Sequence, residues 1–512
     1  MLRHARTIAF VLLAACGAKA YKNHSGSPTS VAYYEPSAAP AAPGGAIAAE
    51  PGSTPGDTHV SHGVNPWTET SRDALSTFAA DVDTASYTYA RRTLQGGALP
   101  PPASVRVEEF VNAFKYSFPK PQPGSPFSVV MDAAPSPFAP GNHILRVGVA
   151  TPAKSQAERK TANLVFLVDV SGSMDSPDKI LLAKKSLEIL LSNLRESDTV
   201  SLVTYAGATK LVLPATSVEH KAKILEAINS LKVGGSTSMG SGLDLAYEQA
   251  MQSMRPGTIS RVIVLSDGDT NVGPTSHQKI LDIIDSRVKA GVTLSTIGFG
   301  MGNYRADLME QLGDRGNGNN YYIDSLAAAR KLFSTDLVSV LEVAAKDAKL
   351  QVEFDPNVVA RYRLIGYENR DIKDNDFRKD SVDAGEIGAG HQVTAMYEVQ
   401  LTDGAKVQPA SLGLVRIRHK QPDGHEASEN TFKMNGVPAA SFENASDDLK
   451  FAFAVASFAD MLRGAEDAQN WSLDHAIAVA RATAKGDADR LELVELMSKA
   501  RTMRGTKTTV AR

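Results

Sequence analysis

Cysteine is almost absent from this sequence of 512 residues, whose single cysteine is Cys16. One cysteine cannot form an intramolecular disulfide. It also excludes zinc sites built from several cysteines and iron–sulfur clusters. A metal site in this chain must therefore be built from other ligands.

The sequence also lacks an excess of charge of one sign. Its 54 Lys and Arg residues are nearly balanced by 57 Asp and Glu residues, for a formal net charge of -3, so the composition gives no electrostatic signature of nucleic-acid binding. Hydrophobic residues make up 43% and charged residues 22%, which excludes a mostly disordered chain, a fibrous repeat and a multi-pass membrane protein. At about 150 residues per domain, the length predicts roughly three domains.

The N-terminus has the organisation of an export signal. Arg3 and Arg6 precede the apolar run 8–13, which is too short to span a bilayer. The run ends in Leu13-Ala14-Ala15-Cys16-Gly17. This ending resembles a bacterial lipoprotein signal, in which the cysteine that becomes acylated follows the cleavage site directly.

This resemblance implies that residues 1–15 are removed and that Cys16 carries a diacylglycerol anchor. The residue directly after the cysteine is Gly17 rather than Asp. By analogy with enteric lipoproteins, this implies sorting to the outer membrane of the cell envelope, with the periplasmic or surface face left open. An ordinary secretory peptide with an incidental cysteine is the alternative.

Residues 16–64 are predicted to be a tether. From Gly17 to Val64, 29 of 48 residues are Ala, Gly, Pro or Ser, and such a stretch cannot bury enough apolar surface to offset the entropy of ordering it. A flexible tether fits a lipid anchor that holds a folded body away from a membrane. A leader without a role has the same composition and is the alternative. Order is expected to begin near Asn65.

Hydrophobic periodicity divides the remaining chain into three parts. Residues 65–155 combine two amphipathic helices with two strands, which predicts an α+β N-terminal flanking module. In residues 161–345, continuous apolar runs such as 164–168 alternate with helices of ten or more residues. That alternation is typical of an α/β domain with a doubly wound, mostly parallel sheet. Residues 346–512 predict a β-rich and then α-helical C-terminal flanking module.

Two polar residues are expected to cap the helices of the N-terminal module. Asp83 precedes a helical stripe that contains Tyr87 and Leu94, and Ser104 precedes a second stripe that contains Phe110. Asp and Ser are favoured at the N-cap because their side chains accept hydrogen bonds from the free N–H groups of the first turn.

Three polar loops within residues 161–345 form the candidate functional site. The first follows strand 164–168, the second lies between two helices, and the third follows strand 262–265. The candidate metal ligands in these loops are Asp169, Ser171, Ser173, Thr237 and Asp267. Open α/β sheets bind ligands at the carboxyl ends of their strands. An oxygen-only set suits Mg²⁺, Mn²⁺ or, as a third candidate, Ca²⁺, rather than zinc or copper. The alternative is that both Asp residues only cap helices and turns.

The order and spacing of these loops resemble a von Willebrand factor A domain with its metal-ion-dependent adhesion site. The resemblance implies that Ser171, Ser173 and Thr237 bind metal through their hydroxyls, and that Asp169 and Asp267 act directly or through water. An incoming carboxylate, commonly from a partner protein, would complete the octahedron. Mostly neutral hydroxyl ligands leave the ion electron-poor, so it should attract an external Asp or Glu strongly.

Four further segments extend the resemblance beyond this domain. They are residues 76–87, 99–102, 362–370 and 383–391. They resemble the flanking modules of a bacterial family of A-domain lipoproteins, so that the likeness covers nearly all of residues 65–512. The family has no established biochemical activity and its flanking modules have no assigned functional residues. The resemblance therefore implies an architecture and a metal site, without a reaction.

The sequence thus predicts a lipid-anchored protein of the bacterial cell envelope that binds a protein or peptide carboxylate through Mg²⁺ or Mn²⁺. We identify no nucleophile–base pair, so the protein is not expected to be an enzyme. One alternative is an envelope scaffold in which the metal is purely structural and only holds loops together. The other is a metal-dependent hydrolase that uses water on the same ion, although the motif loops supply no positioned general base.

Overall fold

The computed structural model describes residues 56–510 apart from residues 81, 122–124, 237, 270–273, 383, 408–409, 425, 435 and 469–470. The predicted signal peptide, Cys16 and most of the predicted tether lie outside the described residues, as does Thr237. Within the described part of the chain, no helix combines the length and the apolar character needed to cross a membrane.

A six-stranded sheet in the order β10-β9-β8-β5-β6-β7 forms the centre of residues 161–345. Its strands are β5 (Ala162–Asp169), β6 (Thr199–Tyr205), β7 (Lys210–Ser217), β8 (Ile259–Ser266), β9 (Thr293–Phe299) and β10 (Asn320–Ile323). All neighbouring strands pair in parallel except β7, which is antiparallel to β6. Every residue of β5 is buried, as in a strand covered on both faces. The predicted doubly wound, mostly parallel sheet is confirmed.

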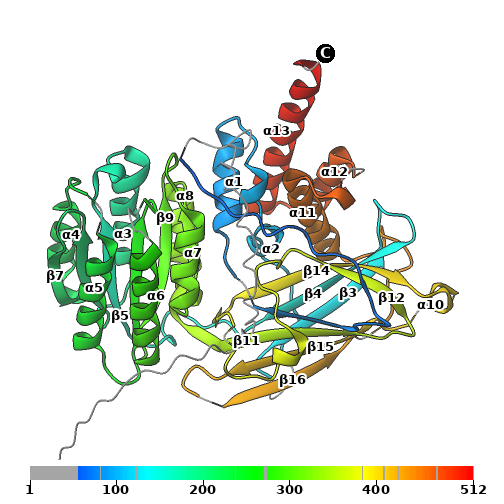
Figure 1. Cartoon of the computed structure of the whole chain (residues 1–512), viewed down its shortest axis with the longest axis horizontal. Helices are drawn as coiled ribbons and strands as arrows, with labels where there is room; N and C mark the ends of the chain where they lie inside the picture. The colour runs from blue at the N-terminus through cyan, green and yellow to red at the C-terminus, as the bar shows by residue number, and fades with distance from the viewer. Residues whose placement is uncertain are drawn as a thin grey trace, which may run out of the picture. The chain divides into compact units, whose positions relative to one another are not determined.

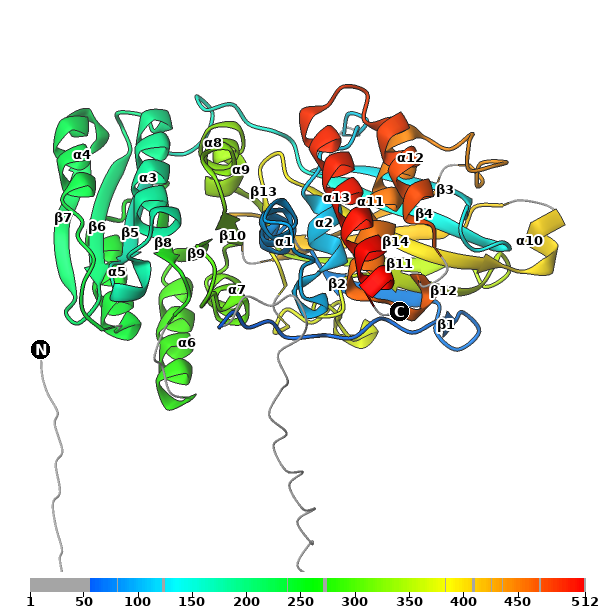
Figure 2. The same ribbon diagram turned by 90° about the horizontal axis from the view of Figure 1, so that it is seen from above.

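Helices cover both faces of this sheet (Figures 1 and 2). One face carries α3 (Leu182–Asn193), α4 (Lys221–Asn229), α8 (Leu326–Arg330) and α9 (Leu337–Leu341), and the other carries α5 (Met239–Ser253), α6 (Pro274–Lys289) and α7 (Ala306–Arg315). Successive side chains of β5 point to opposite faces. Phe166 therefore joins the apolar layer under α3, and Leu167 joins the layer under α5. The last helical segment of the domain is divided into α8 and α9 by the π-helical turn η5 (Lys331–Thr335).

Two antiparallel sheets are built jointly by residues on either side of the parallel-sheet domain. Their orders are β1-β12-β14-β4-β3 and β13-β11-β15-β16, with β2 also paired to β11. The strands before the domain are β1 (Thr68–Glu69), β2 (Leu75–Ala79), β3 (Ser128–Pro135) and β4 (Asn142–Ala150). Those after it are β11 (Val343–Phe354), β12 (Val359–Ile365), β13 (Ile387–Gly388), β14 (Gln392–Leu401), β15 (Gly413–Lys420) and β16 (Ala427–Lys433).

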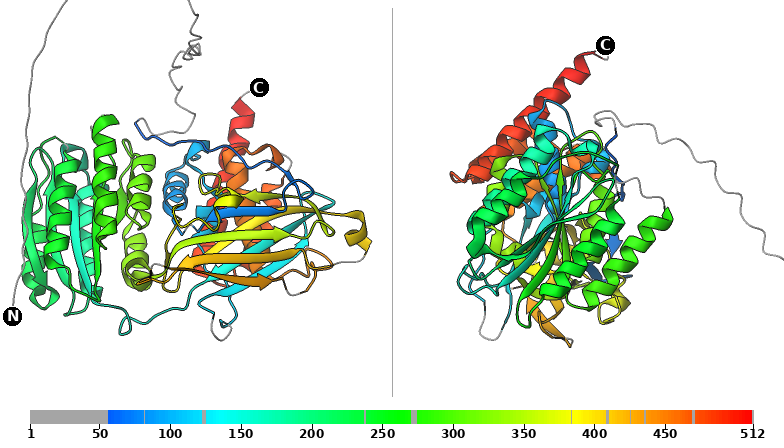
Figure 3. Two further views of the ribbon diagram at one scale, coloured as in Figure 1. Left: turned by 60° about the horizontal axis from the view of Figure 1, so that its bottom comes forward. Right: turned by 90° about the vertical axis from the view of Figure 1, so that its left-hand side faces the viewer.

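The pairing of β4 with β14 joins the two flanking segments directly. Their register runs from Asn142 opposite Gln400 to Ala150 opposite Gln392. The left view of Figure 3 shows cyan strands from before the parallel-sheet domain beside yellow strands from after it. Both segments also contribute to one apolar core between the sheets, for example through Val147 and Val393. The flanking segments therefore fold together, with the parallel-sheet domain inserted between them.

Helices from both flanking segments form a layer beside the first antiparallel sheet. They are α1 (Ala85–Gln95), α2 (Val107–Asn112), α11 (Asp447–Arg463), α12 (Leu473–Thr483) and α13 (Ala488–Val510), and a short α10 (Asp403–Val407) follows β14. In this layer α2 and α11 contact the sheet, α12 and α13 pack on neighbouring helices, and α1 packs on β10 of the parallel sheet. The Ser446 hydroxyl accepts the N–H of Leu449 at the start of α11, and Gly464 ends the helix in the left-handed conformation. The predicted change from strands to helices in the C-terminal flanking module is confirmed.

The two expected helix caps of the N-terminal module are wrong. Helix α1 begins after Thr84 and α2 after Arg106. The carboxylate of Asp83 instead accepts the backbone N–H of Asn320 in β10 at 2.9 Å, and the hydroxyl of Ser104 donates to the carbonyl of Pro101 at 2.7 Å. Asp83 thus connects the loop before α1 to the edge of the parallel sheet.

Candidate metal centre

The candidate site lies where the order of the parallel strands reverses. From β5, the strands β6 and β7 extend to one side and β8, β9 and β10 to the other. Asp169 is the last residue of β5, and Asp267 follows Ser266 at the end of β8. Because β5 and β8 are neighbours, both carboxylates lie at the carboxyl edge of the sheet, at the switch point where open α/β sheets bind ligands.

Asp169 is fully buried among neutral hydrogen-bond donors. Its Oδ1 accepts the backbone N–H of Ser171 at 2.9 Å. Its Oδ2 accepts the hydroxyls of Tyr205 at 3.0 Å and of Ser266 at 2.9 Å. Burial raises the pKa of Asp169 to about 6, with a smaller contribution in the same direction from the Asp267 carboxylate, while the hydrogen bonds oppose the shift. A nearby cation would therefore stabilise the charged form of this carboxylate.

The hydroxyls of Ser171 and Ser173 fit a small octahedral cation. Their oxygen atoms lie 3.0 Å apart, with Ser171 buried and Ser173 partly exposed at the rim. Adjacent ligand oxygens of an octahedral magnesium ion, each about 2.1 Å from the metal, are also about 3.0 Å apart. The described residues contain no group of three or more His, Cys, Asp or Glu side chains that could hold a metal. A metal site here therefore depends on these hydroxyls together with the two carboxylates.

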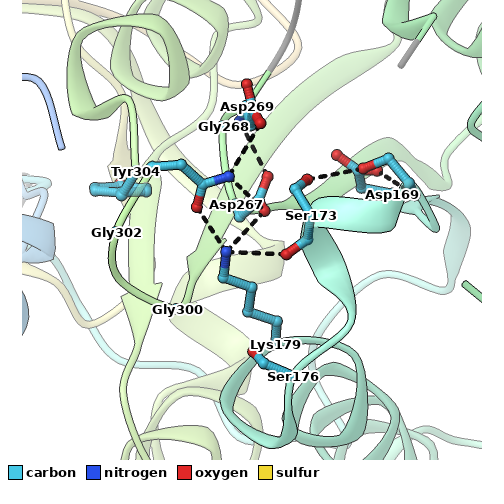
Figure 4. Close-up of polar contacts among 12 residues, drawn as sticks. Asp169, Ser173, Ser176, Lys179, Asp267, Gly268, Asp269, Gly300, Gly302 and Tyr304 are labelled. Atoms are coloured by element: carbon cyan, nitrogen blue, oxygen red, sulfur yellow. Dashed lines mark hydrogen bonds and ion pairs between the residues drawn. The ribbon is translucent and has the colours of Figure 1, made fainter. Parts of the chain in front are cut away.

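Asp267 contacts a buried cation that the sequence analysis did not identify. The Lys179 ammonium lies 3.0 Å from Asp267 Oδ2 and also donates to the carbonyl of Ser173 at 3.0 Å and to Oδ1 of Asn303 at 2.6 Å (Figure 4). Lys179 is only 6% exposed and lies in η3, a π-helical turn (Pro177–Leu181) that precedes α3. A side chain at Gly300 would collide with the methylene groups of Lys179, so glycine there leaves room for the lysine.

Asn303 is the second contact of Asp267 that the sequence analysis missed. Its Nδ2 donates to Asp267 Oδ2 and to Asp269 Oδ2, at 3.1 Å in each case. The backbone N–H of Asp269 also donates to Asp267 Oδ1 at 3.0 Å. Asn303 lies in the loop between β9 and α7. A signal was available, because this loop also follows the carboxyl end of a parallel strand, where ligand-binding residues of such sheets gather.

The structure thus brings together four of the five predicted ligands. Asp169, Ser171, Ser173 and Asp267 meet at one edge of the sheet, and Thr237 lies outside the described residues. Lys179 neutralises part of the negative charge of this edge. A divalent ion held there would keep positive charge that the protein does not balance, and so could attract an external anion.

Comparisons with known families divide the chain in the same way as the fold. The family described as von Willebrand factor type A domain matches residues 163–335. One described as von Willebrand factor matches residues 54–146, and one described as the C-terminal part of the uncharacterized protein YfbK matches residues 339–503.

Among the proteins that resemble the chain are two sequence relatives and one solved structure. The uncharacterized protein YfbK of Escherichia coli is 39% identical over 432 residues, which cover 80% of this chain and 74% of that protein. The uncharacterized protein sll0103 of Synechocystis is 27% identical over 286 residues, or 54% of this chain and 66% of that protein. The structure of a von Willebrand factor type A protein from Catenulispora acidiphila matches with a TM-score of 0.42 and 16% identity, over 77% of this chain and 90% of that one.

Proposed function

This chain belongs to the family of the uncharacterized protein YfbK, and from that premise we propose a metal-dependent binding function. Its von Willebrand factor type A domain binds Mg²⁺ or Mn²⁺, and through the ion it binds a carboxylate of a protein or peptide ligand. The observation that carries this proposal is the pair of hydroxyl oxygens of Ser171 and Ser173, 3.0 Å apart, beside the buried carboxylate of Asp169.

The hydroxyls and the carboxylates of the site would contribute to metal binding in different ways. Ser171, Ser173 and Thr237 would hold the ion through neutral hydroxyls, and Asp169 and Asp267 would balance its charge directly or through water. Bound there, the ion supplies a Lewis-acidic position for an external carboxylate. Partly exposed Ser173 lies at the rim, so a ligand can approach from solvent. Lys179 adds positive charge on the same edge, which also favours an anionic ligand.

Two measurements on the full chain test the metal site. They are calorimetric titration with Mg²⁺ and Mn²⁺ and thermal unfolding with and without these ions. Wild type should bind one ion and gain thermal stability, whereas Asp169→Ala should show neither response. Asp244→Ala is the matched control, because it removes an exposed carboxylate on α5 and should bind as wild type does. If wild type and Asp169→Ala shift equally with Mg²⁺, the site is excluded.

A peptide array tests the ligand class. Fluorescently labelled protein is applied in Mg²⁺ to peptides that contain Asp or Glu and to matched peptides with Asn or Gln. Acidic peptides should be bound only in Mg²⁺, and EDTA or Thr237→Ala should abolish the signal. Binding that survives EDTA would instead support a scaffold whose metal only staples loops. A crosslinking pull-down from the cell envelope, with Thr237→Ala as control, would then identify the natural ligand.

We further propose that the protein is anchored in the bacterial cell envelope, in the outer membrane, through lipid on Cys16. The support is the sequence Leu13-Ala14-Ala15-Cys16-Gly17 after a short apolar run. Metabolic labelling with a palmitate analogue tests it. The label should appear in wild type and be lost in Cys16→Ser, and a soluble, unlabelled wild-type protein would exclude the anchor.

A further inference from the structure

The first described residues of the chain are bound to the loop that carries Asn303. We call residues 56–59 the N-terminal strap. Oδ1 of Asp57 accepts the backbone N–H groups of Gly302 at 2.8 Å and of Tyr304 at 2.7 Å, which are the residues on either side of Asn303. The sequence predicts a flexible tether through residue 64, but Asp57 holds this loop as an N-cap residue holds the start of a helix.

Further contacts fix the strap in place. The N–H of Thr58 donates to the carbonyl of Tyr304 at 3.0 Å, and Thr58 forms a parallel bridge with Arg305. The Tyr89 hydroxyl of α1 donates to Oδ2 of Asp57 at 2.9 Å. The ring of His59 packs edge-on against that of Tyr89, with centroids 4.7 Å apart.

Helix α1 also holds the segment that carries Lys179. The guanidinium of Arg92 forms an ion pair with Asp178, the residue directly before Lys179. Arg92 donates as well to the hydroxyl of Tyr322 at 3.3 Å, and Tyr322 donates to the carbonyl of Gly300. The two side chains that contact Asp267 are therefore both positioned from outside the parallel-sheet domain, Lys179 through α1 and Asn303 through the strap.

We propose that the N-terminal strap sets the metal affinity of this site, with Asp57 as the positioning residue. The inference rests on the proposed metal-binding function and names how that site is regulated. Asp57 fixes the loop around Asn303, whose amide oxygen accepts one of the hydrogen bonds donated by the Lys179 ammonium. When the strap is released, the amide of Asn303 moves away from both Lys179 and Asp267. Asp267 then exchanges a neutral hydrogen bond for a stronger bond with the ammonium. Asp267 is then less available to a divalent ion.

Release of the strap should therefore weaken metal binding. In Asp57→Ala, the N–H groups of Gly302 and Tyr304 lose their shared acceptor, and we expect the affinity for Mg²⁺ to fall about tenfold, within the usual range of coupling between two sites. Linkage also requires the converse effect. Saturation with Mg²⁺ should favour the bound strap by the same factor and slow the hydrogen exchange of these two amides in wild type.

The experiment uses the full chain and two measurements. Calorimetry gives the affinity for Mg²⁺, and hydrogen exchange with mass spectrometry follows the peptide that contains residues 302–304, with and without Mg²⁺. The variants are Asp57→Ala and the milder Asp57→Asn, which keeps one acceptor oxygen. Ser61→Ala is the matched control. Ser61 lies just after the strap, and its hydroxyl accepts the N–H of the nearby Gly63 rather than an N–H of the loop around Asn303.

Affinity should fall in the order wild type, Asp57→Asn, Asp57→Ala, and Ser61→Ala should match wild type. Mg²⁺ should slow exchange of the peptide in wild type and have a much smaller effect in Asp57→Ala. Equal affinities in wild type and a folded Asp57→Ala would overturn the inference and leave the metal site intact. Failure of wild type itself to bind Mg²⁺ would instead overturn the proposed function, on which the inference rests.

Discussion

The two carboxylates of the candidate site are held in different ways. We call Asp169 with the side chains and backbone groups that bind it the Asp169 half, and Asp267 with its contacts the Asp267 half. In the first, all donors are neutral, and burial raises the pKa of Asp169 to about 6. In the second, the ammonium of Lys179 and the amide of Asn303 share one carboxylate oxygen.

The origin of these contacts differs as well. The donors to Asp169 come from β6, from the end of β8 and from the residues directly after β5, so the sheet itself fixes them. The side-chain donors to Asp267 come from a π-helical turn and from the loop after β9, which α1 and the N-terminal strap hold from outside the domain. The backbone N–H of Asp269 is a local donor, as that of Ser171 is for Asp169. One switch point therefore combines a fixed half with a half that other parts of the chain can adjust.

The largest difference between the halves should appear in stability without metal. Asp267→Asn leaves the buried ammonium of Lys179 without its anion, and we expect the free energy of unfolding to fall by about 3 kcal/mol or more. Asp169→Asn removes a carboxylate whose burial is already unfavourable, so the change should stay below about 1 kcal/mol. Urea unfolding in EDTA measures both. Equal losses in the two variants would show that the halves do not differ in charge balance.

The next largest effect is expected when the charge of Lys179 is removed. Lys179→Met removes a cation that competes with the metal for Asp267, so the affinity for Mg²⁺ should rise about tenfold, or by about 1.4 kcal/mol. Lys185→Met is the control, because Lys185 is exposed and pairs with Glu188 on the same helix, α3. Calorimetry measures both variants. A weaker affinity in Lys179→Met would mean that the lysine organises the site more than its charge opposes the ion.

Local sequence could predict both carboxylates and the hydroxyls of the first loop, but not the hydroxyls of Tyr205 and Ser266 that bind Asp169. The apolar run of β5 followed by Asp169, Ser171 and Ser173 is a short-range pattern, and Asp267 follows a second buried strand in the same way. The rule that ligands gather at strand ends also extends to the loop after β9, where Asn303 lies. The position of Asn303 can therefore be predicted from the sequence by the same rule.

The remaining contacts depend on residues far apart in the chain. Asp57 bonds to Gly302 and Tyr304 across 245 and 247 positions, and it lies in a stretch whose composition predicts a tether. Likewise β4 pairs with β14 across the inserted domain. Period-two patterns predict that a strand exists and which face is buried, but they do not identify its partner.

The smallest predicted effect is a dependence of the strap on pH. Burial, followed by the charge of Arg106, lowers the pKa of His59 to about 4, while Asp307 opposes the shift. Since a released histidine has a pKa near 6.5, the released strap binds protons more readily. The stability that His59 gives the bound strap is therefore complete above pH 6.5 and is lost as the pH falls toward 4.

Between pH 7.5 and pH 6 this loss amounts to about 0.8 kcal/mol, or roughly a fourfold larger released population. Hydrogen exchange of residues 302–304 in EDTA should show it, with the intrinsic exchange rate cancelled by comparison with His59→Gln at each pH. The glutamine variant does not titrate, so the ratio of wild-type to variant exchange should rise about fourfold on acidification. A constant ratio would mean that His59 stays neutral in both states and that the strap holds the Asp267 half through Asp57 alone.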